Sequence, residues 1–308
     1  MHIPVLKNEV LEYLDAKPNK NFIDCTIDGG GHAKEILEII KPEGKLLGID
    51  RDEEMINSLL TEFQNSNLGD RLILTCENFA NLKKIVEKYN FGKVCGILFD
   101  LGTSSWHLKE SGRGFSFQKD EVLDMRYQIK SQISIRQPAN KSQRELTAEE
   151  IVNKWPENKI ERILSEYGEE KFAKEIAKEI SEKRRKTPIE TTFQLTEIIK
   201  DSVPGWYLHK KIHFATKTFQ ALRIAVNNEL KNLEIVLPKV LEVLEPEGRI
   251  VIISFHSLED RIVKNFFREG AKEGKLRILT KKPVSPSSQE LELNPSSRSA
   301  KLRAAIKL

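Results

Sequence analysis

Short apolar runs bounded by polar residues and glycine recur at a regular interval in the first third of the chain. They begin at Asn21, Leu46, Arg71 and Val94, so that 23 to 25 residues separate one start from the next. Between them, as in the segment 82–89, apolar residues follow a helical period. Strand and helix therefore alternate as repeated βα units, which predicts an α/β fold with a parallel sheet covered by helices on both faces.

The next apolar run typical of a strand, 249–254, begins 155 residues after the start of the fourth run. The residues between them are mostly of helical period, and Thr147 and Glu150 have the spacing of a capping box. A last strand is expected at 302–308, after a Ser- and Pro-rich segment, 283–299, that predicts an irregular loop.

This spacing predicts two domains, one of them discontinuous. A sheet domain would comprise residues 1–107 and 211–308, and a helical domain would be inserted at 108–210. The insertion follows the fourth strand, at the edge where open α/β sheets bind their ligands, so we expect it to shape a substrate site.

Composition excludes several classes of protein. No apolar run is long enough to span a membrane, and the first residues lack the features of a signal peptide, so we expect a cytoplasmic protein without membrane contact. The three cysteines have no CxxC spacing and the six histidines are scattered, which predicts neither disulfides nor a metal site. The net charge is +4, and residues 271–308 hold nine Lys or Arg against three Glu. This tail indicates either a polyanionic partner or a solvated terminal surface.

A glycine turn follows the first predicted strand. Gly30 and Gly31 stand in the run DGGGH, which opens a helix, and Asp50 ends the second strand 20 residues beyond Gly30. Glycine lets a ligand approach the backbone, and a carboxylate at that strand end can accept hydrogen bonds from ribose hydroxyls. The spacing therefore predicts a pocket for a nucleoside cofactor.

The residues around this turn favour one cofactor over another. The dinucleotide fingerprint needs Gly or Ala where this chain has Lys34, and Asp24 and Asp28 would repel a pyrophosphate. S-adenosylmethionine carries an ammonium and a sulfonium and no phosphate, so an acidic turn suits it. Two alternatives stay open: the aspartates cap the turn, or the chain is an NAD-dependent oxidoreductase.

Two loops at the same predicted edge carry groups suited to catalysis. The loop after the fourth strand has the sequence DLGTSSWH and the loop after the fifth has SFHSLEDR. An alternative for the second loop is a helix start, with Ser257 and Asp260 as its cap. The catalytic candidates are Asp100, Thr103, Ser104, Ser105, Ser254, His256 and Ser257.

Several longer motifs make the chain recognisable: FIDCTIDGGGH, DLGTSS, GRGFSF, FQALRIAVNNEL and ISFHSLEDR. Over essentially its whole length the chain resembles the bacterial 16S ribosomal RNA cytosine-N4 methyltransferase family. The resemblance implies a Rossmann-like, class I S-adenosylmethionine-dependent methyltransferase sheet with an inserted helical domain that recognises the substrate. It also implies transfer of a methyl group to the exocyclic N4 of a cytidine in the decoding region of 16S rRNA, within the small ribosomal subunit.

The resemblance also assigns residues to the cofactor. By its motifs, S-adenosylmethionine would contact Gly30, Gly31, His32, Asp50, Phe79, Asp100 and His107. The family often has Gln at the position of His107 and Pro at that of Trp106, so this loop departs from the family pattern.

Methylation of a cytosine amino group sets further requirements. The amino lone pair is delocalised into the ring, so transfer needs alignment with the methyl group and an acceptor for the amino proton. The D/N-P-P-Y/F motif of many amino-methyltransferases is absent. We expect Asp100 to lie near the cofactor, with acceptors from residues 103–105 or 254–257.

The base must also leave any stack or pair, and basic residues that contact phosphates can offset that cost. Each of them is alternatively a solvated surface charge, and the sequence leaves open both a homodimer and a non-catalytic RNA-binding assembly protein with a vestigial pocket. The candidates for RNA contact are Arg113, Arg126, Lys183, Arg184, Arg185, Arg223, Lys281, Lys282 and Arg298.

Overall fold

The computed structural model describes residues 4–64, 69–128 and 146–308. Its residue contacts divide the chain into two compact units. The sheet unit comprises Met1–Gly102 and Leu230–Leu308, and the helical unit comprises Thr103–Glu229. The helical unit therefore extends beyond the expected boundary at residue 210. The reason is that helix α11 (Thr216–Asn227) packs Phe219 and Leu222 into the helical core.

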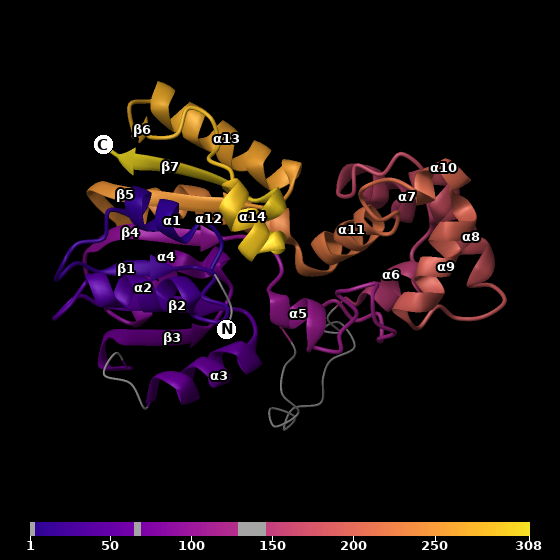
Figure 1. Ribbon diagram of the computed structural model, residues 1–308, viewed down its shortest axis with the longest axis horizontal. Helices are drawn as coiled ribbons and strands as arrows, with labels where there is room; N and C mark the ends of the chain where they lie inside the picture. The colour runs from indigo at the N-terminus through magenta and orange to yellow at the C-terminus, as the bar shows by residue number, and fades with distance from the viewer. Residues whose placement is uncertain (1–3, 65–68, 129–145) are drawn as a thin grey trace. The chain divides into compact units, whose positions relative to one another are not determined.

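The sheet unit is built on seven strands in the order β3-β2-β1-β4-β5-β7-β6, which can be followed from one edge to the other in Figure 1. The first five strands pair in parallel, as the sequence predicts, whereas β7 is antiparallel to both β5 and β6. The order reverses at β1, so the sheet is a doubly wound, Rossmann-like sheet. The strands are β1 (Phe22–Asp24), β2 (Leu46–Asp50), β3 (Leu72–Cys76), β4 (Val94–Asp100), β5 (Leu244–Ser254), β6 (Leu276–Ile278) and β7 (Lys301–Lys307).

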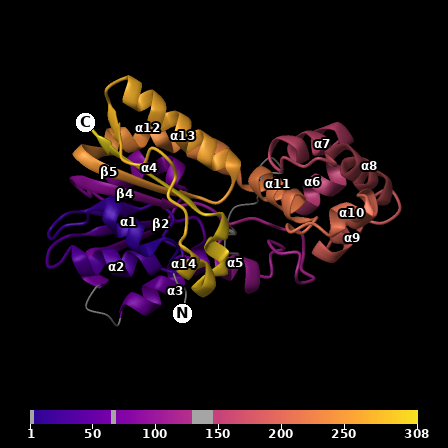
Figure 2. The same cartoon turned by 45° about the horizontal axis from the view of Figure 1, so that its top comes forward.

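Alternate strand residues face two separate cores. In β4, Ile97 and Phe99 belong to one buried cluster and Leu98 to the other. The first cluster is covered by α4 (Leu82–Lys88), α12 (Glu229–Val243) and α13 (Ser257–Lys272), and the second by α1 (Lys7–Leu14), α2 (Gly31–Ile39) and α3 (Glu53–Gln64). Figure 2 shows these two groups of helices on opposite sides of the strands, so the prediction of a sheet covered on both faces is confirmed.

Two details near the C-terminus differ from the expectation. Strand β6 has three residues, too few to show a period of two along the sequence. The segment 283–299 contains helix α14 (Ser288–Leu293) and a 3-10 turn (Pro295–Ser299), so the prediction of an irregular loop is wrong there. The Ser287 side chain accepts a hydrogen bond from the Glu290 amide and thereby starts α14, a signal hidden among many Ser and Pro residues.

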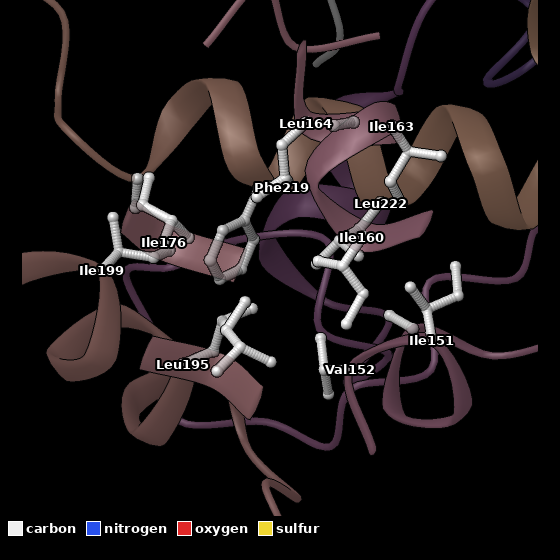
Figure 3. Packing of buried hydrophobic residues seen from close by; sticks show 14 of the residues in the cluster. Ile151, Val152, Ile160, Ile163, Leu164, Ile176, Leu195, Ile199, Phe219 and Leu222 are labelled. Atoms are coloured by element: carbon white, nitrogen blue, oxygen red, sulfur yellow. The ribbon is translucent and has the colours of Figure 1, made fainter. Parts of the chain in front are cut away.

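The helical unit has its own apolar core, in which the Phe219 ring lies among side chains from several helices (Figure 3). The predicted cap is present, because the Thr147 side chain accepts a hydrogen bond from the Glu150 amide. No helix in the described ranges is long and apolar enough to cross a membrane. The helices are α5 (Ser105–Lys109), α6 (Ala148–Lys154), α7 (Glu157–Glu166), α8 (Ala173–Lys183), α9 (Thr192–Ser202), α10 (Gly205–Leu208) and α11.

Candidate functional site

Three neighbouring parallel strands of the sheet unit end in aspartate. Asp24 ends β1, Asp50 ends β2 and Asp100 ends β4. Since parallel strands place their carboxyl ends at one edge of the sheet, the three carboxylates gather there. Asp24 is 1% exposed, so this edge holds buried as well as accessible negative charge. Such an edge favours a cationic ligand.

The predicted glycine turn lies beside these carboxylates and opens α2. Gly30 has a φ of +71°, and a Cβ there would lie 2.8 Å from Cδ2 of Leu59. The backbone angle therefore favours glycine, and a larger residue would also displace the end of the Leu59 side chain. A Cβ on Gly31 would lie 3.1 Å from Cβ of Pro4, whereas nothing lies within 4 Å of one on Gly29. Gly30 and Gly31 therefore pack closely against neighbouring side chains, whereas Gly29 lies next to open space.

Backbone amides hold the Asp50 carboxylate in place. The amide of Asp28 donates to Oδ2 at 3.1 Å and the amide of Asp52 donates to Oδ1 at 2.9 Å. Asp28 itself has a φ of +43°, a conformation that Asp tolerates better than most residues. The carboxylate is thus fixed at the end of β2, where ribose hydroxyls bind in this type of fold.

His32 and Asp100 lie close together at this edge, and several of their polar atoms have no hydrogen-bond partner among the described residues. His32 is 6% exposed, and its Nε2 lies 3.7 Å from Oδ2 of Asp100. Neither ring nitrogen of His32 nor Oδ1 of Asp100 has a hydrogen-bond partner among the described residues. A buried polar group left unpaired costs about 1–3 kcal/mol. These atoms therefore indicate that a ligand completes the site.

The pKa of Asp24 is raised from its ordinary value of 3.8 to about 7. Burial is the largest cause, and it outweighs the lowering by His32 and by a hydrogen bond from the Thr26 amide, while the negative charges of Asp100 and Asp50 add smaller increases. A bound cation would favour the ionised carboxylate, so Asp24 links the charge of the site to pH near neutrality. The sequence points to Asp24 only as part of an acidic turn, because its burial depends on the strands on either side.

Phe79 follows β3 in a short 3-10 turn, Phe79–Asn81. The Asn78 side chain caps this turn by accepting a hydrogen bond from the Ala80 amide at 2.9 Å. The Phe79 ring packs edge-on against Phe99, with 5.6 Å between ring centroids. A partly buried aromatic ring next to the end of β2 suits an adenine base.

The loop after β5 contains one buried hydroxyl and a histidine cap. Ser254 is fully buried, and its Oγ has no hydrogen-bond partner among the described residues. Nδ1 of His256 accepts a hydrogen bond from the Glu259 amide, and the Glu259 carboxylate accepts one from the His256 amide. The helix start expected at Ser257 and Asp260 therefore lies one residue earlier, at His256 and Glu259.

In the helical unit, Ser104 caps the N-terminus of α5 and forms hydrogen bonds with His107. Oγ of Ser104 accepts a hydrogen bond from the His107 amide at 3.2 Å and lies 2.8 Å from Nδ1 of the same residue. The His107 ring is 4% exposed and packs edge-on against Trp106, Phe115 and Tyr127. His107 is therefore fixed within an aromatic cluster, and Ser105 follows Ser104 in the first turn of α5.

A network of hydrogen bonds fixes the Thr103 side chain. The sequence did not predict this network. A guanidinium N–H of Arg223 on α11 donates to Oγ1 of Thr103, which lies 2.9 Å from the hydroxyl of Tyr127. Arg223 also pairs with Glu229 at 3.0 and 3.1 Å. Asn227, on the same helix, accepts from the Tyr127 amide at 3.0 Å and donates to the Met125 carbonyl at 2.7 Å. The motif FQALRIAVNNEL contains three of these residues and was the available signal.

Other arginines proposed for RNA contact are also held by internal groups. Arg113 is 6% exposed, donates to the Tyr127 carbonyl at 3.1 Å and lies over the Trp106 ring. Arg126 makes two hydrogen bonds to Asp124, at 2.7 and 2.6 Å. Arg184 donates to the Val152 carbonyl at 2.8 Å, and burial lowers its pKa.

The remaining basic candidates lie on the surface. Arg185, Lys281, Lys282 and Arg298 are exposed. Lys183 is exposed too, within 3.5 Å of carboxylate oxygens of both Glu179 and Asp201. The structure thus separates surface cations that face solvent from arginines that stabilise the helical unit.

A Rossmann-like sheet whose edge combines a glycine turn, a fixed carboxylate at the end of β2 and a cluster of negative charge defines an S-adenosylmethionine-dependent methyltransferase. The chain belongs to the MraW methylase family, whose match covers residues 1–308.

Curated relatives are similar over almost their whole length. The Ribosomal RNA small subunit methyltransferase H of Sulfurihydrogenibium azorense is 46% identical over 310 residues, covering 100% of this chain and 99% of its own. The proteins of the same name from Symbiobacterium thermophilum and Thermotoga neapolitana are 43% and 45% identical, covering 100% and 99% of this chain and 96% and 95% of their own. A solved rRNA methylase from Streptococcus thermophilus aligns over 98% of this chain and 93% of its own at 10% identity, with a TM-score of 0.44, too low to carry a conclusion.

The residues present fit S-adenosylmethionine. The unpaired His32 and Asp100 atoms and the buried Asp24 offer hydrogen bonds and negative charge to a cationic ligand. Neither the NAD-dependent oxidoreductase nor the non-catalytic assembly protein gains support, since these curated relatives are all named methyltransferases.

Proposed function

We propose that this chain transfers a methyl group from S-adenosylmethionine to the exocyclic N4 of a cytidine in the decoding region of 16S rRNA, presented by the small ribosomal subunit. The observation that carries the proposal is the His32–Asp100 pair at the acidic edge of the sheet, whose ring nitrogens and Oδ1 have no hydrogen-bond partner among the described residues. The names of the relatives and the resemblance of the motifs support the choice of RNA substrate.

Bound S-adenosylmethionine supplies a methyl group made electrophilic by a positively charged sulfur. Asp50 accepts hydrogen bonds from the ribose, and Phe79 packs against the adenine. Gly30 and Gly31 let the cofactor approach the backbone, with His32 beside it. His107, which the resemblance adds to these contacts, is buried in the helical unit and oriented by its hydrogen bond with Ser104.

Asp100 receives the cytosine amino group in this proposal. As the bond between N4 and the methyl carbon forms, the bond between that carbon and sulfur breaks, and N4 gives up one proton. The Asp100 carboxylate orients the amino group and accepts this proton, since its side chain is 20% exposed at the edge of the sheet. Ser254, at the end of the strand next to β4, is fully buried, so its part in the proposal is to support the end of β5. Proximity and orientation contribute about 7–11 kcal/mol to such a transfer.

Thr103, Ser104 and Ser105 orient the segment after β4. Part of the hydrogen-bonding capacity of the Thr103 oxygen is taken up by Arg223 and Tyr127, and that of Ser104 by His107. In the proposal, these residues therefore fix the backbone of the segment after β4, and their part in accepting the proton is the smaller one. His256 and Ser257 likewise set the start of α13 beside Ser254.

The RNA is held by cations on the surface. Arg185, Lys281, Lys282 and Arg298 are exposed, and contact with phosphates offsets the few kcal/mol needed to take a base out of its stack. The buried arginines, Arg113 among them, contribute by keeping the helical unit folded.

The test is transfer of labelled methyl from S-adenosylmethionine to undermethylated small ribosomal subunits and, in parallel, to free 16S rRNA, followed by nucleoside analysis. Wild-type protein should produce N4-methylcytidine. Asp100→Ala should lower the rate at least about 100-fold while circular dichroism stays unchanged, and replacing the exposed Asp70 by Ala should change little. Wild-type turnover in Asp100→Ala would remove Asp100 from the mechanism, and absence of N4-methylcytidine with both substrates would overturn the proposal.

A further inference from the structure

The helical unit exposes one tryptophan to an unusual degree. Trp206 on α10 is 54% exposed, although tryptophan buries most of its surface in typical proteins. An exposed indole combines a large apolar face with a polar N–H and is enriched where proteins bind partners. The position of Trp206 therefore calls for a functional explanation.

A fixed aromatic base supports this indole. Phe172 and Tyr207 pack edge-on against Trp206, with 5.9 and 5.8 Å between ring centroids. Tyr207 is 6% exposed, and its hydroxyl lies 2.9 Å from both carboxylate oxygens of the buried Glu170. Because Tyr207 is anchored in this way, the indole is presented in a set orientation.

Lysines surround the exposed ring. Nζ of Lys171 lies 5.3 Å and Nζ of Lys210 lies 4.9 Å from the indole centroid, within the range of cation–π attraction. Lys211 is exposed next to them, and the sequence has no Asp or Glu between Asp201 and Glu229. The exposed charges seen over the indole are therefore those of two lysines, while the Glu170 carboxylate is buried against Tyr207. Cation–π attraction is weak at exposed sites, so these ammonium groups can move to a stronger anionic partner.

We propose that Trp206, Lys171 and Lys210 bind an unpaired nucleotide of the RNA substrate. The base stacks on the indole, and the two ammonium groups contact the flanking phosphates. This inference rests on the proposed function, which supplies RNA as the substrate. An aromatic platform ringed by cations matches the two features of single-stranded RNA, a flat base and a charged backbone. An acidic peptide would match the charge but leave the indole face unused.

A second exposed aromatic residue of the same unit provides a matched control. Phe193 is 46% exposed, but its amide donates to the Asp120 carboxylate at 3.3 Å and its neighbour Glu190 is exposed. No lysine or arginine is seen over its ring among the described residues. The surroundings of Phe193 should repel a phosphate, so its replacement should leave RNA affinity unchanged.

The experiment measures binding of the full-length protein to a single-stranded oligoadenylate of twelve nucleotides and to deproteinised 16S rRNA. Trp206→Leu should weaken both about 5-fold to 100-fold, Trp206→Phe should retain most of the affinity, and Phe193→Leu should match wild type. Binding of inorganic polyphosphate, which has charge but no bases, should not change in Trp206→Leu. Lys171→Gln with Lys210→Gln should reduce the slope of log affinity against log salt by about 1.4.

Unchanged RNA affinity in Trp206→Leu overturns the inference, and so does an equal loss for polyphosphate. Loss of binding to intact small subunits alone, with naked RNA unaffected, would instead assign the surface to a ribosomal protein and also overturn it. Because binding is measured without methyl transfer, failure of the proposed function would appear separately, as absence of N4-methylcytidine at saturating RNA. Unchanged affinity for S-adenosylmethionine in each variant shows that the sheet unit is intact.

Discussion

The two units differ in whether their buried ionisable groups have hydrogen-bond partners. At the edge of the sheet unit, the ring nitrogens of His32 and Oδ1 of Asp100 are buried without a hydrogen-bond partner among the described residues, and Asp24 is buried at an energetic cost. In the helical unit, Arg223 and Arg113 are buried or nearly so, yet each donates to identified oxygens of the same unit. The sheet edge therefore holds ionisable atoms that a ligand can pair with, whereas these two arginines of the helical unit are paired within their own unit.

Asp24→Asn tests whether burial of an ionisable carboxyl group destabilises the sheet unit. A folded-state pKa of about 7 against an ordinary value of 3.8 means that the folded protein binds more protons between these values, so Asp24 lowers stability as pH rises through this range. The variant should match wild type near pH 4 and gain stability over it up to about pH 8, by at most about 4 kcal/mol.

Urea denaturation at several pH values measures this gain, and hydrogen exchange of β1 amides assigns it to the sheet unit. A difference between Asp24→Asn and wild type that does not vary with pH would contradict the buried, titrating carboxylate.

Asn227→Ala tests how much the internal hydrogen bonds of Asn227 stabilise the helical unit. The variant leaves the buried Tyr127 amide and Met125 carbonyl without their partner, which should cost about 3 kcal/mol of unfolding free energy. Hydrogen exchange should show faster opening in the helical unit and unchanged β1. Asn158→Ala, at an exposed position of α7, is the control and should stay within about 0.5 kcal/mol of wild type. Equal stabilities of the two variants would show that the Asn227 network is not needed.

Asp50→Ala tests whether the carboxylate at the end of β2 binds the cofactor. Loss of hydrogen bonds from a ribose to a charged group should weaken S-adenosylmethionine by about 2 kcal/mol, close to 30-fold. Isothermal titration calorimetry measures this change. Unchanged affinity would contradict the ribose assignment, while RNA binding by the helical unit should be the same in both proteins.

Gly30→Ala and Gly29→Ala give the smallest effect. The first places a Cβ 2.8 Å from Leu59 at a φ of +71°, which should cost about 1–2 kcal/mol and weaken cofactor binding. The second meets nothing within 4 Å and should be nearly neutral. Thermal unfolding compares the pair, and equal midpoints would show that the turn relaxes without strain.

The sequence predicted the sheet edge well and the helical network poorly. The starts of the first four strands, the glycine turn and the position of Asp50 agree with the structure, because each depends on residues a few positions apart or on one βα repeat. Strand β5 begins at Leu244, five residues before the expected start at residue 249. Arg223 looked like a phosphate contact, because its partner Thr103 lies 120 positions away in the chain. Its pairing with Glu229 gave no periodic signal either.

By itself, the sequence determined the alternation of strand and helix, the glycine turn and the acidic strand ends, since these follow from the backbone geometry of short segments. Only the tertiary structure decided which arginines are buried and which cations face solvent, and that atoms of His32 and Asp100 lack hydrogen-bond partners in the part of the chain that the structure describes. It also raised the pKa of Asp24 and left Trp206 exposed between lysines. The physical reason is that desolvation and hydrogen-bond pairing depend on atoms brought together from distant parts of the chain, and local patterns do not encode them.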